Sequence, residues 1–85
     1  MGEGESFGWA IKQLYNGSRA RRAGWNGKGM FLFLVAEWKP TNVAAVAPDK
    51  YPVLPFIAMK TADEKVVPWL ASQTDMLAVD WEIAD

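Results

Sequence analysis

An unbroken apolar run lies at residues 29–36, with the sequence GMFLFLVA. The run is short for a globular helix and rich in aromatic residues, so it predicts a central β-strand that is buried on both faces. Just before it, Asn26-Gly27 is a strong signal for a two-residue hairpin turn. We predict that residues 19–25 form the short, basic partner strand. We therefore expect this hairpin to form the centre of a β-sheet.

The flanking segments predict one helix and several further strands. Ser6 is a suitable N-cap, and the apolar residues that follow it recur at helical spacing, which predicts a helix over residues 6–16. The other predicted elements are strands at 56–60, 65–70 and 79–84, a turn at 61–64 and a short helical turn at 71–78. This order predicts an α+β fold in which the N-terminal helix packs on a small antiparallel sheet of about five strands, with one short helical turn before the last strand.

The chain has 85 residues, the length of one small domain. We predict a disordered leader at residues 1–5 and a single domain over 6–85. The longest irregular segment, 37–55, contains all but one of the five prolines. Loops of this length in small domains are usually functional or disordered.

The composition argues against catalysis, because the chain has no histidine and no cysteine. The commonest general base, the thiol nucleophile and cysteine-based zinc sites are therefore missing. Two local carboxylate pairs remain. Turn chemistry explains Asp63 and Glu64, and we interpret Asp80 and Glu82 as a solvated strand edge. We predict a protein that is not an enzyme and that uses no cofactor and no metal.

The net charge of −1 argues against general affinity for DNA or RNA. No apolar segment approaches the roughly 20 residues of a membrane span, so no membrane association is expected. The acidic N-terminus lacks the features of a signal peptide, which predicts a cytoplasmic protein. Five tryptophans exceed what one small core can hide. Some of them should line an interface or a ligand, and oligomerisation is a plausible supplement to so small a core.

The hairpin turn carries groups that could bind a nucleotide. Trp25 can stack on a base, Asn26 can pair with a purine edge, and the cations Arg21, Arg22 and Lys28 can meet phosphates. The alternative is a plain hairpin, because Asn-Gly is a preferred turn and an exposed lysine there is ordinary. Local chemistry alone favours the plain hairpin.

A second polar cluster lies in the predicted helical turn, at Ser72, Gln73, Thr74 and Asp75. Ser72 and Asp75 are explained best as a capping box. Gln73 and Thr74 could instead supply hydrogen bonds to ribose hydroxyls, and both interpretations stay open.

Two segments, GWNGKGMFLFL and VPWLASQTDMLAVDW, occur in this order and resemble the Thoeris anti-defense 2-like family, formerly a domain of unknown function. The resemblance extends over residues 6–84. Two positions depart from the family's pattern. Glu64 stands where glycine is expected in the hairpin turn, which leaves the turn type open. Val79 stands where an acidic residue is frequent.

The resemblance implies a phage or prophage protein in the cytoplasm of the infected or lysogenic host. Such proteins sequester cyclic nucleotide signals of host TIR-domain sensors, notably glycocyclic ADP-ribose, without cleaving them. Similar proteins form homotetramers, dimers of dimers with ligand recesses between subunits. Alternatives are a sponge for cyclic di- or trinucleotides, a cyclic-nucleotide hydrolase, or a plain interaction module. The candidate ligand-binding residues are Arg21, Arg22, Trp25, Asn26, Lys28, Met30, Gln73, Thr74 and Asp75.

Overall fold

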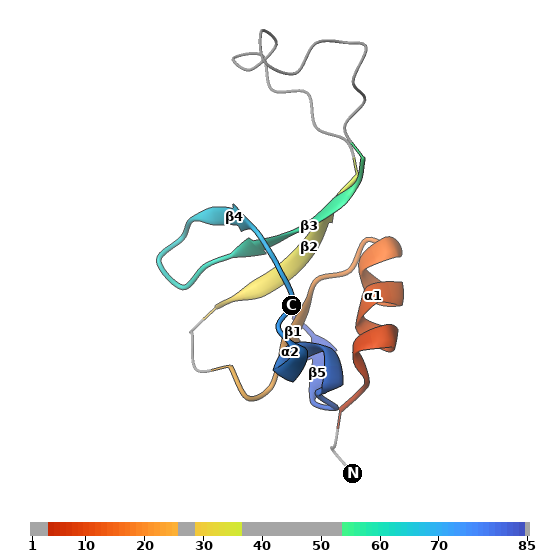
Figure 1. The fold of residues 1–85 in the computed structure, drawn as a ribbon. Coiled ribbons are helices and arrows are strands. Elements are labelled where there is room, and N and C mark those ends of the chain that lie inside the picture. The colour runs from red at the N-terminus through yellow and green to blue at the C-terminus, as the bar shows by residue number, and fades with distance from the viewer. Residues whose placement is uncertain (1–3, 26–28, 37–53, 85) are drawn as a thin grey trace, which may run out of the picture.

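The computed structural model describes residues 4–25, 29–36 and 54–84 (Figure 1). The elements in chain order are α1 (Phe7–Tyr15), β1 (Ala20–Arg22), β2 (Phe31–Val35), β3 (Phe56–Lys60), β4 (Val66–Pro68), α2 (Gln73–Leu77) and β5 (Trp81–Ile83). The strands form one antiparallel sheet in the order β4-β3-β2-β1-β5. This confirms the predicted α+β fold, including the short helix before the last strand.

Serine side chains cap the first turns of both helices. The Ser6 hydroxyl accepts a hydrogen bond from the Trp9 amide at 3.2 Å and caps α1. Gly17 follows that helix at φ 91°, a left-handed conformation that glycine adopts without a steric penalty. Ser72 caps α2 by accepting from the Asp75 amide at 3.1 Å. Both caps agree with the sequence prediction.

The partner strand is shorter than predicted. We expected residues 19–25, whereas β1 covers only Ala20–Arg22. The Trp25 amide donates to the Arg22 carbonyl at 3.1 Å, so the chain turns immediately after the strand. The edge strand β4 likewise ends at Pro68, which cannot donate to the ladder.

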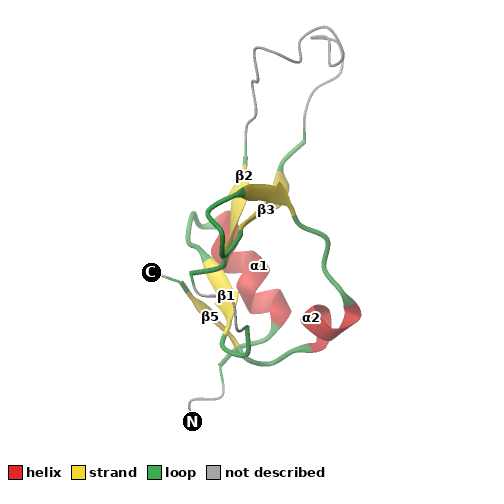
Figure 2. Cartoon of the chain, turned by 90° about the vertical axis from the view of Figure 1, so that its left-hand side faces the viewer, coloured by secondary structure: helices red, strands yellow, loops and turns green. Residues whose placement is uncertain are grey.

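The central strand is more deeply buried on one face than on the other. Leu32 has no exposed surface and faces α1, whereas Phe31 and Phe33 point to the opposite face and are half-buried. Figures 1 and 2 show α1 lying along one side of the sheet. The prediction of burial on both faces is therefore wrong for this single chain, because no described helix covers the second face. We call these the covered face and the open face.

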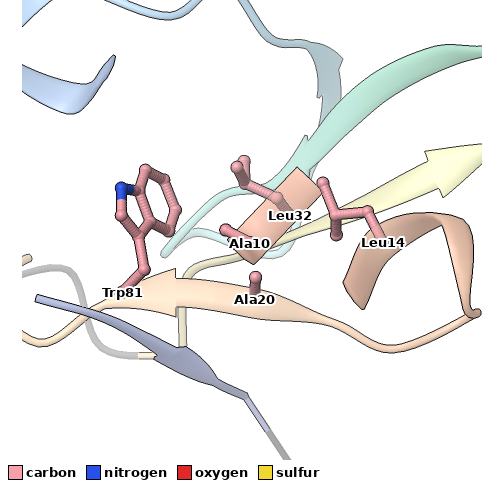
Figure 3. Close-up of a cluster of buried hydrophobic side chains, with 5 residues drawn as sticks. All are labelled: Ala10, Leu14, Ala20, Leu32 and Trp81. Atoms are coloured by element: carbon pink, nitrogen blue, oxygen red, sulfur yellow. The ribbon is translucent and has the colours of Figure 1, made fainter. Parts of the chain in front are cut away.

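The core of the covered face joins the helix to three strands. Its fully or almost fully buried members are Ala10, Leu14, Ala20, Leu32 and Trp81 (Figure 3). Trp81 is the largest of them and lies entirely out of solvent. A tryptophan buries roughly 150–250 Å², so this one side chain contributes on the order of 4–6 kcal/mol of hydrophobic stabilisation.

Glu5, which lies in the predicted leader, pairs with Trp81 of β5. The Glu5 amide donates to the Trp81 carbonyl at 2.9 Å, and the Trp81 amide donates back at 3.0 Å. These bonds cover the outer edge of β5 beside the core tryptophan. Within the described residues, neither helix has the length and apolar character that a bilayer span requires.

Candidate functional site

A small pocket lies at the end of the β1–β2 hairpin, with a volume of about 220 Å³. Its lining residues are Arg21, Arg22, Ala23, Trp25, Gly29, Met30 and Glu82. Four of the nine predicted site residues therefore meet in one place, namely Arg21, Arg22, Trp25 and Met30. The predicted site residues Asn26 and Lys28 lie outside the described residues.

The other predicted residues lie on α2. Gln73 and Thr74 are exposed there and do not line this pocket. Asp75 is joined to the pocket indirectly, because the Arg22 Nη1 donates to its Oδ1 at 2.8 Å. Within one chain, the structure thus brings together the described hairpin residues and Asp75, but not Gln73 or Thr74.

Asp80 fixes the first wall of the pocket. Its Oδ2 accepts a hydrogen bond from the Gly24 amide at 2.9 Å, and its Oδ1 accepts from Arg22 Nε, also at 2.9 Å. A Cβ on Gly24 would lie 3.0 Å from Oδ2, so a larger residue would push the carboxylate away. One aspartate therefore holds both the turn backbone and the preceding arginine.

Arg22 bridges two carboxylates and is largely shielded from solvent. Its side chain is 19% exposed, and it pairs with Asp75 and Asp80. Hydrogen bonds to Asp80 and then Asp75 raise the pKa of Arg22. The Arg22 hydrogen bond is also the main cause that lowers the pKa of Asp80, against a smaller opposing effect of burial.

Asp75 is ionised for a similar reason. Burial raises the pKa of Asp75, but hydrogen bonds from Arg22, Ser72 and the Trp25 side chain together outweigh it and lower the pKa below its ordinary value. Both carboxylates stay charged at neutral pH and are occupied by donors. They are therefore poorly placed to act as general acids or bases.

Lys60 fixes the second wall from the neighbouring strand β3. Its Nζ donates to the Gly29 carbonyl at 3.1 Å and pairs with Glu64 at 2.8 Å. Gly29 has a φ of 77°, which glycine tolerates and other residues rarely adopt. The two walls of the pocket are thus held independently, one by Asp80 and the other by Lys60.

Trp25 belongs to both the pocket and an aromatic cluster. Its ring meets those of Trp81 and Trp69 edge-on, with centroids 5.5 and 6.5 Å away. Phe7 completes the cluster through tilted contacts with Trp69 and Trp81. The orientation of the pocket indole is therefore set by packing against the core.

Arg21 is the more available cation of the pocket. Its Nε pairs with Glu82 Oε2 at 2.8 Å, but both side chains are more than two-fifths exposed. Exposed pairs of this kind contribute about 0–1 kcal/mol, so a phosphate could compete for the guanidinium. Arg21 lies on the open face and Arg22 on the covered face, since adjacent strand residues point to opposite sides.

Sequence reasoning missed Asp80 and Lys60. Asp80 was assigned to a solvated strand edge, yet it is partly buried and bonded to two parts of the hairpin. The sequence carried no specific signal for this role, because the pairing of β1 with β5 that places Asp80 near Arg22 follows from the sheet order. Nothing in the local sequence pairs Lys60 with Gly29, because their contact depends on the β2–β3 register.

The remaining chemistry of the described chain is limited. Among residues 4–25, 29–36 and 54–84, no group of three or more acidic side chains is arranged to hold a metal ion. Two further pockets of about 350 Å³ each are lined mainly by apolar residues of α1 and β2–β4. The hairpin pocket differs from these two in combining an indole with charged groups.

Comparisons with known proteins agree on one family. Residues 6–84 match the Thoeris anti-defense 2-like domain. The chain is also 44% identical over 82 residues to a protein of Bacillus phage SP01 described as "Thoeris anti-defense 2". That alignment covers 92% of each protein.

Proposed function

Because the chain belongs to the Thoeris anti-defense 2-like family, we propose that it disarms host immunity by sequestering a cyclic nucleotide signal, glycocyclic ADP-ribose, in the hairpin pocket. The observation that carries the proposal is the meeting of Trp25 and Arg21 in that pocket. An indole can stack on adenine, with about 1–3 kcal/mol per base. A guanidinium can hold phosphate oxygens in a bidentate fork.

The size of the pocket supports a site shared between subunits. A volume of about 220 Å³ is below the roughly 300–1,000 Å³ of typical small-molecule sites. We therefore propose a homotetramer in which a second copy completes each recess. Leu70 and Leu77, which flank and end α2, are 92% and 78% exposed and support a subunit contact there. Such a contact could bring Gln73 and Thr74 to a ligand.

The proposed action is binding without cleavage. The chain contributes no histidine or cysteine, and Asp75 and Asp80 are both held ionised by Arg22. The two carboxylates that Arg22 holds beside the hairpin pocket are thus not poised to accept a proton. Binding alone must then lower the free signal. A nanomolar dissociation constant corresponds to about −12 kcal/mol, which an enclosed, preformed recess can reach. The protein would act in the cytoplasm of an infected or lysogenic host.

The decisive experiment is calorimetry with glycocyclic ADP-ribose, followed by heat denaturation and mass spectrometry of the released ligand. We expect tight, saturable binding and intact ligand. Degraded ligand would indicate a hydrolase instead. Cyclic di- and trinucleotides tested in parallel show whether the pocket prefers another signal, and an absence of binding to any of them would leave a plain interaction module.

Residue assignment needs a matched pair of charge variants. Arg21→Gln should weaken binding about tenfold or more, and less so at high salt, because the lost contact is electrostatic. Lys65→Gln removes the same charge from the far hairpin, where the side chain is 71% exposed, and should leave affinity unchanged. Equal affinities for both variants would move the phosphate contact away from Arg21.

A further inference from the structure

Arg22 connects three separate parts of the chain. Its Nε donates to Asp80 and its Nη1 to Asp75, at 2.9 and 2.8 Å. Its backbone carbonyl accepts from the Trp25 amide at 3.1 Å. One residue of β1 thereby contacts the segment before β5, the first turn of α2 and the turn that carries Trp25.

Each of the two carboxylate residues forms further hydrogen bonds near Trp25. Asp80 Oδ2 accepts from the Gly24 amide, directly before Trp25. Asp75 accepts from Ser72 Oγ at 3.0 Å, and its backbone carbonyl accepts from Trp81 Nε1, also at 3.0 Å. The indole of Trp81 in turn packs edge-on against the Trp25 ring. Two neighbours of Trp25, the Gly24 amide and the Trp81 indole, are thus bonded to the two aspartates that Arg22 bridges.

The charge balance around Arg22 is unfavourable for an anion. One guanidinium and two carboxylates give the trio a net negative charge. A phosphate approaching Arg22 would meet both carboxylates and would have to displace partly buried, charge-assisted bonds. Arg21, by contrast, pairs with Glu82 alone among the described residues, and that pair is exposed. The neighbouring arginines therefore suit different tasks.

We propose that Arg22 is a positioning residue that acts through Asp75 and Asp80 to hold Trp25 and its turn in the binding orientation, and that it does not itself contact the ligand phosphate. This inference rests on the proposed function of the hairpin pocket. It assigns the orientation of Trp25 to the network of Arg22, Asp75 and Asp80 on the covered face. Arg22 then affects affinity through the geometry of the indole.

The direction in which one substitution changes the ligand affinity distinguishes positioning of Trp25 from direct phosphate binding by Arg22. Asp80→Asn removes a negative charge and weakens the bonds to Arg22 and Gly24. If Arg22 positions Trp25, affinity for glycocyclic ADP-ribose should fall about tenfold or more. If Arg22 binds phosphate directly, the same change frees the arginine and should tighten binding, which would overturn the proposal.

Glu82→Gln is the matched control, because it removes the same charge from the partner of Arg21. That change frees a pocket cation without touching the Trp25 turn, so affinity should rise by a few-fold. If Glu82→Gln weakened binding as much as Asp80→Asn, the loss would not be specific to the Arg22 network, and the proposal would fail. Far-UV circular dichroism and thermal unfolding of each variant establish that it is folded.

Arg22→Lys provides a second route if Asp80→Asn does not fold. Lysine keeps the charge, but a single ammonium does not reproduce the planar fork that spans both carboxylates. Positioning predicts a loss of affinity similar to that of Asp80→Asn. Retention of most of the wild-type affinity would indicate that charge alone suffices and would overturn the positioning role.

A ligand-free measurement keeps this inference distinct from the proposed function. Indole N–H resonances, assigned by Trp→Phe replacements, report the surroundings of Trp25 and Trp81 directly. Asp80→Asn should shift the Trp25 signal, whereas Glu82→Gln should not. If the wild type binds no glycocyclic ADP-ribose, the proposed function fails. The Trp25 resonance then still tests the role of Arg22, because a resonance that Asp80→Asn leaves unchanged refutes positioning.

Discussion

The covered and open faces of the sheet come from the same strands, yet they are stabilised differently. On the covered face, Ala20, Leu32 and Trp81 have no exposed surface. On the open face, Phe31 and Phe33 are half-buried and Val66 is 64% exposed. One side of the sheet thus supplies the core of the isolated chain. The other keeps apolar surface that the described part of a single chain does not bury.

The two faces also divide the charges. Arg22, beside the covered face, is 19% exposed and shared between two carboxylates, whereas Arg21 on the open face is 44% exposed and pairs with Glu82. Consecutive residues of one short strand therefore have different energetics. Disrupting a partly buried network leaves charges without partners, but disrupting an exposed pair costs little. Substitutions that are matched across the sheet should reveal this difference.

The largest difference in the free energy of unfolding is expected between substitutions at two adjacent residues of β2. Leu32→Ala removes a fully buried side chain and should lower the free energy of unfolding by about 2–5 kcal/mol. Phe33→Ala, on the open face, should cost the isolated chain less than half as much, although phenylalanine is the larger residue. Urea unfolding at low protein concentration measures both. Equal losses would show that the open face is covered in solution.

A smaller contrast is expected between the carboxylate partners of the two arginines. Asp80→Asn should destabilise by roughly 1–2 kcal/mol, because it weakens charge-assisted bonds in a partly buried network. Glu82→Gln should change stability by less than about 0.5 kcal/mol, since its pair is exposed. Chemical denaturation at neutral pH separates them. A Glu82→Gln cost as large as that of Asp80→Asn would erase the distinction between the faces.

The same network should make stability depend on acid. The pKa values of Asp75 and Asp80 are lowered in the folded protein, so their stabilisation is fully present above the unfolded-state pKa of about 3.9. It is lost as pH falls through the lower folded pKa values. Thermal unfolding between about pH 6 and 2 should therefore show a falling midpoint below about pH 4. The Asp80→Asn variant should lose part of this dependence, and an unchanged profile would exclude Asp80 as a contributor.

Periodicity and capping rules predicted the elements well, because both depend on local chemistry. The Ser6 and Ser72 caps, the apolar run at 29–36 and the strand patterns at 56–60, 65–70 and 79–84 predicted the α+β order. The predicted two-residue connection at Asn26-Gly27 is too short, because β1 ends at Arg22 and β2 begins at Phe31. Local rules could not predict what covers the second face of the central strand. A continuous apolar run indicates that two faces need burial, but it does not say whether this chain or another copy supplies the second layer.

The candidate site was predictable as a set of residue types and less so as an arrangement. Trp25 and Arg21 were selected for stacking and charge, and they do line one pocket. The roles of Arg22, Asp80 and Lys60 depend on contacts between residues at least 31 positions apart in the sequence. Such pairs follow from strand order and register, which local spacing does not encode.

The smallest predicted effect lies in the β3–β4 turn, where Glu64 holds a φ of 68°. The family resemblance predicts glycine there, and the left-handed backbone costs a non-glycine residue about 1 kcal/mol. Glu64→Gly relieves this cost but removes the ion pair with Lys60, whose glutamate side is 78% exposed and therefore weak. The net change should be a gain of about 0.5 kcal/mol, seen as a rise of a few degrees in the thermal midpoint.

Glu64→Ala, which loses the pair and keeps the strain, should be slightly less stable than the wild type. If Glu64→Gly proved less stable than the wild type, the open-face pair with Lys60 would outweigh the backbone strain, and the open face would contribute more to folding than its exposure suggests.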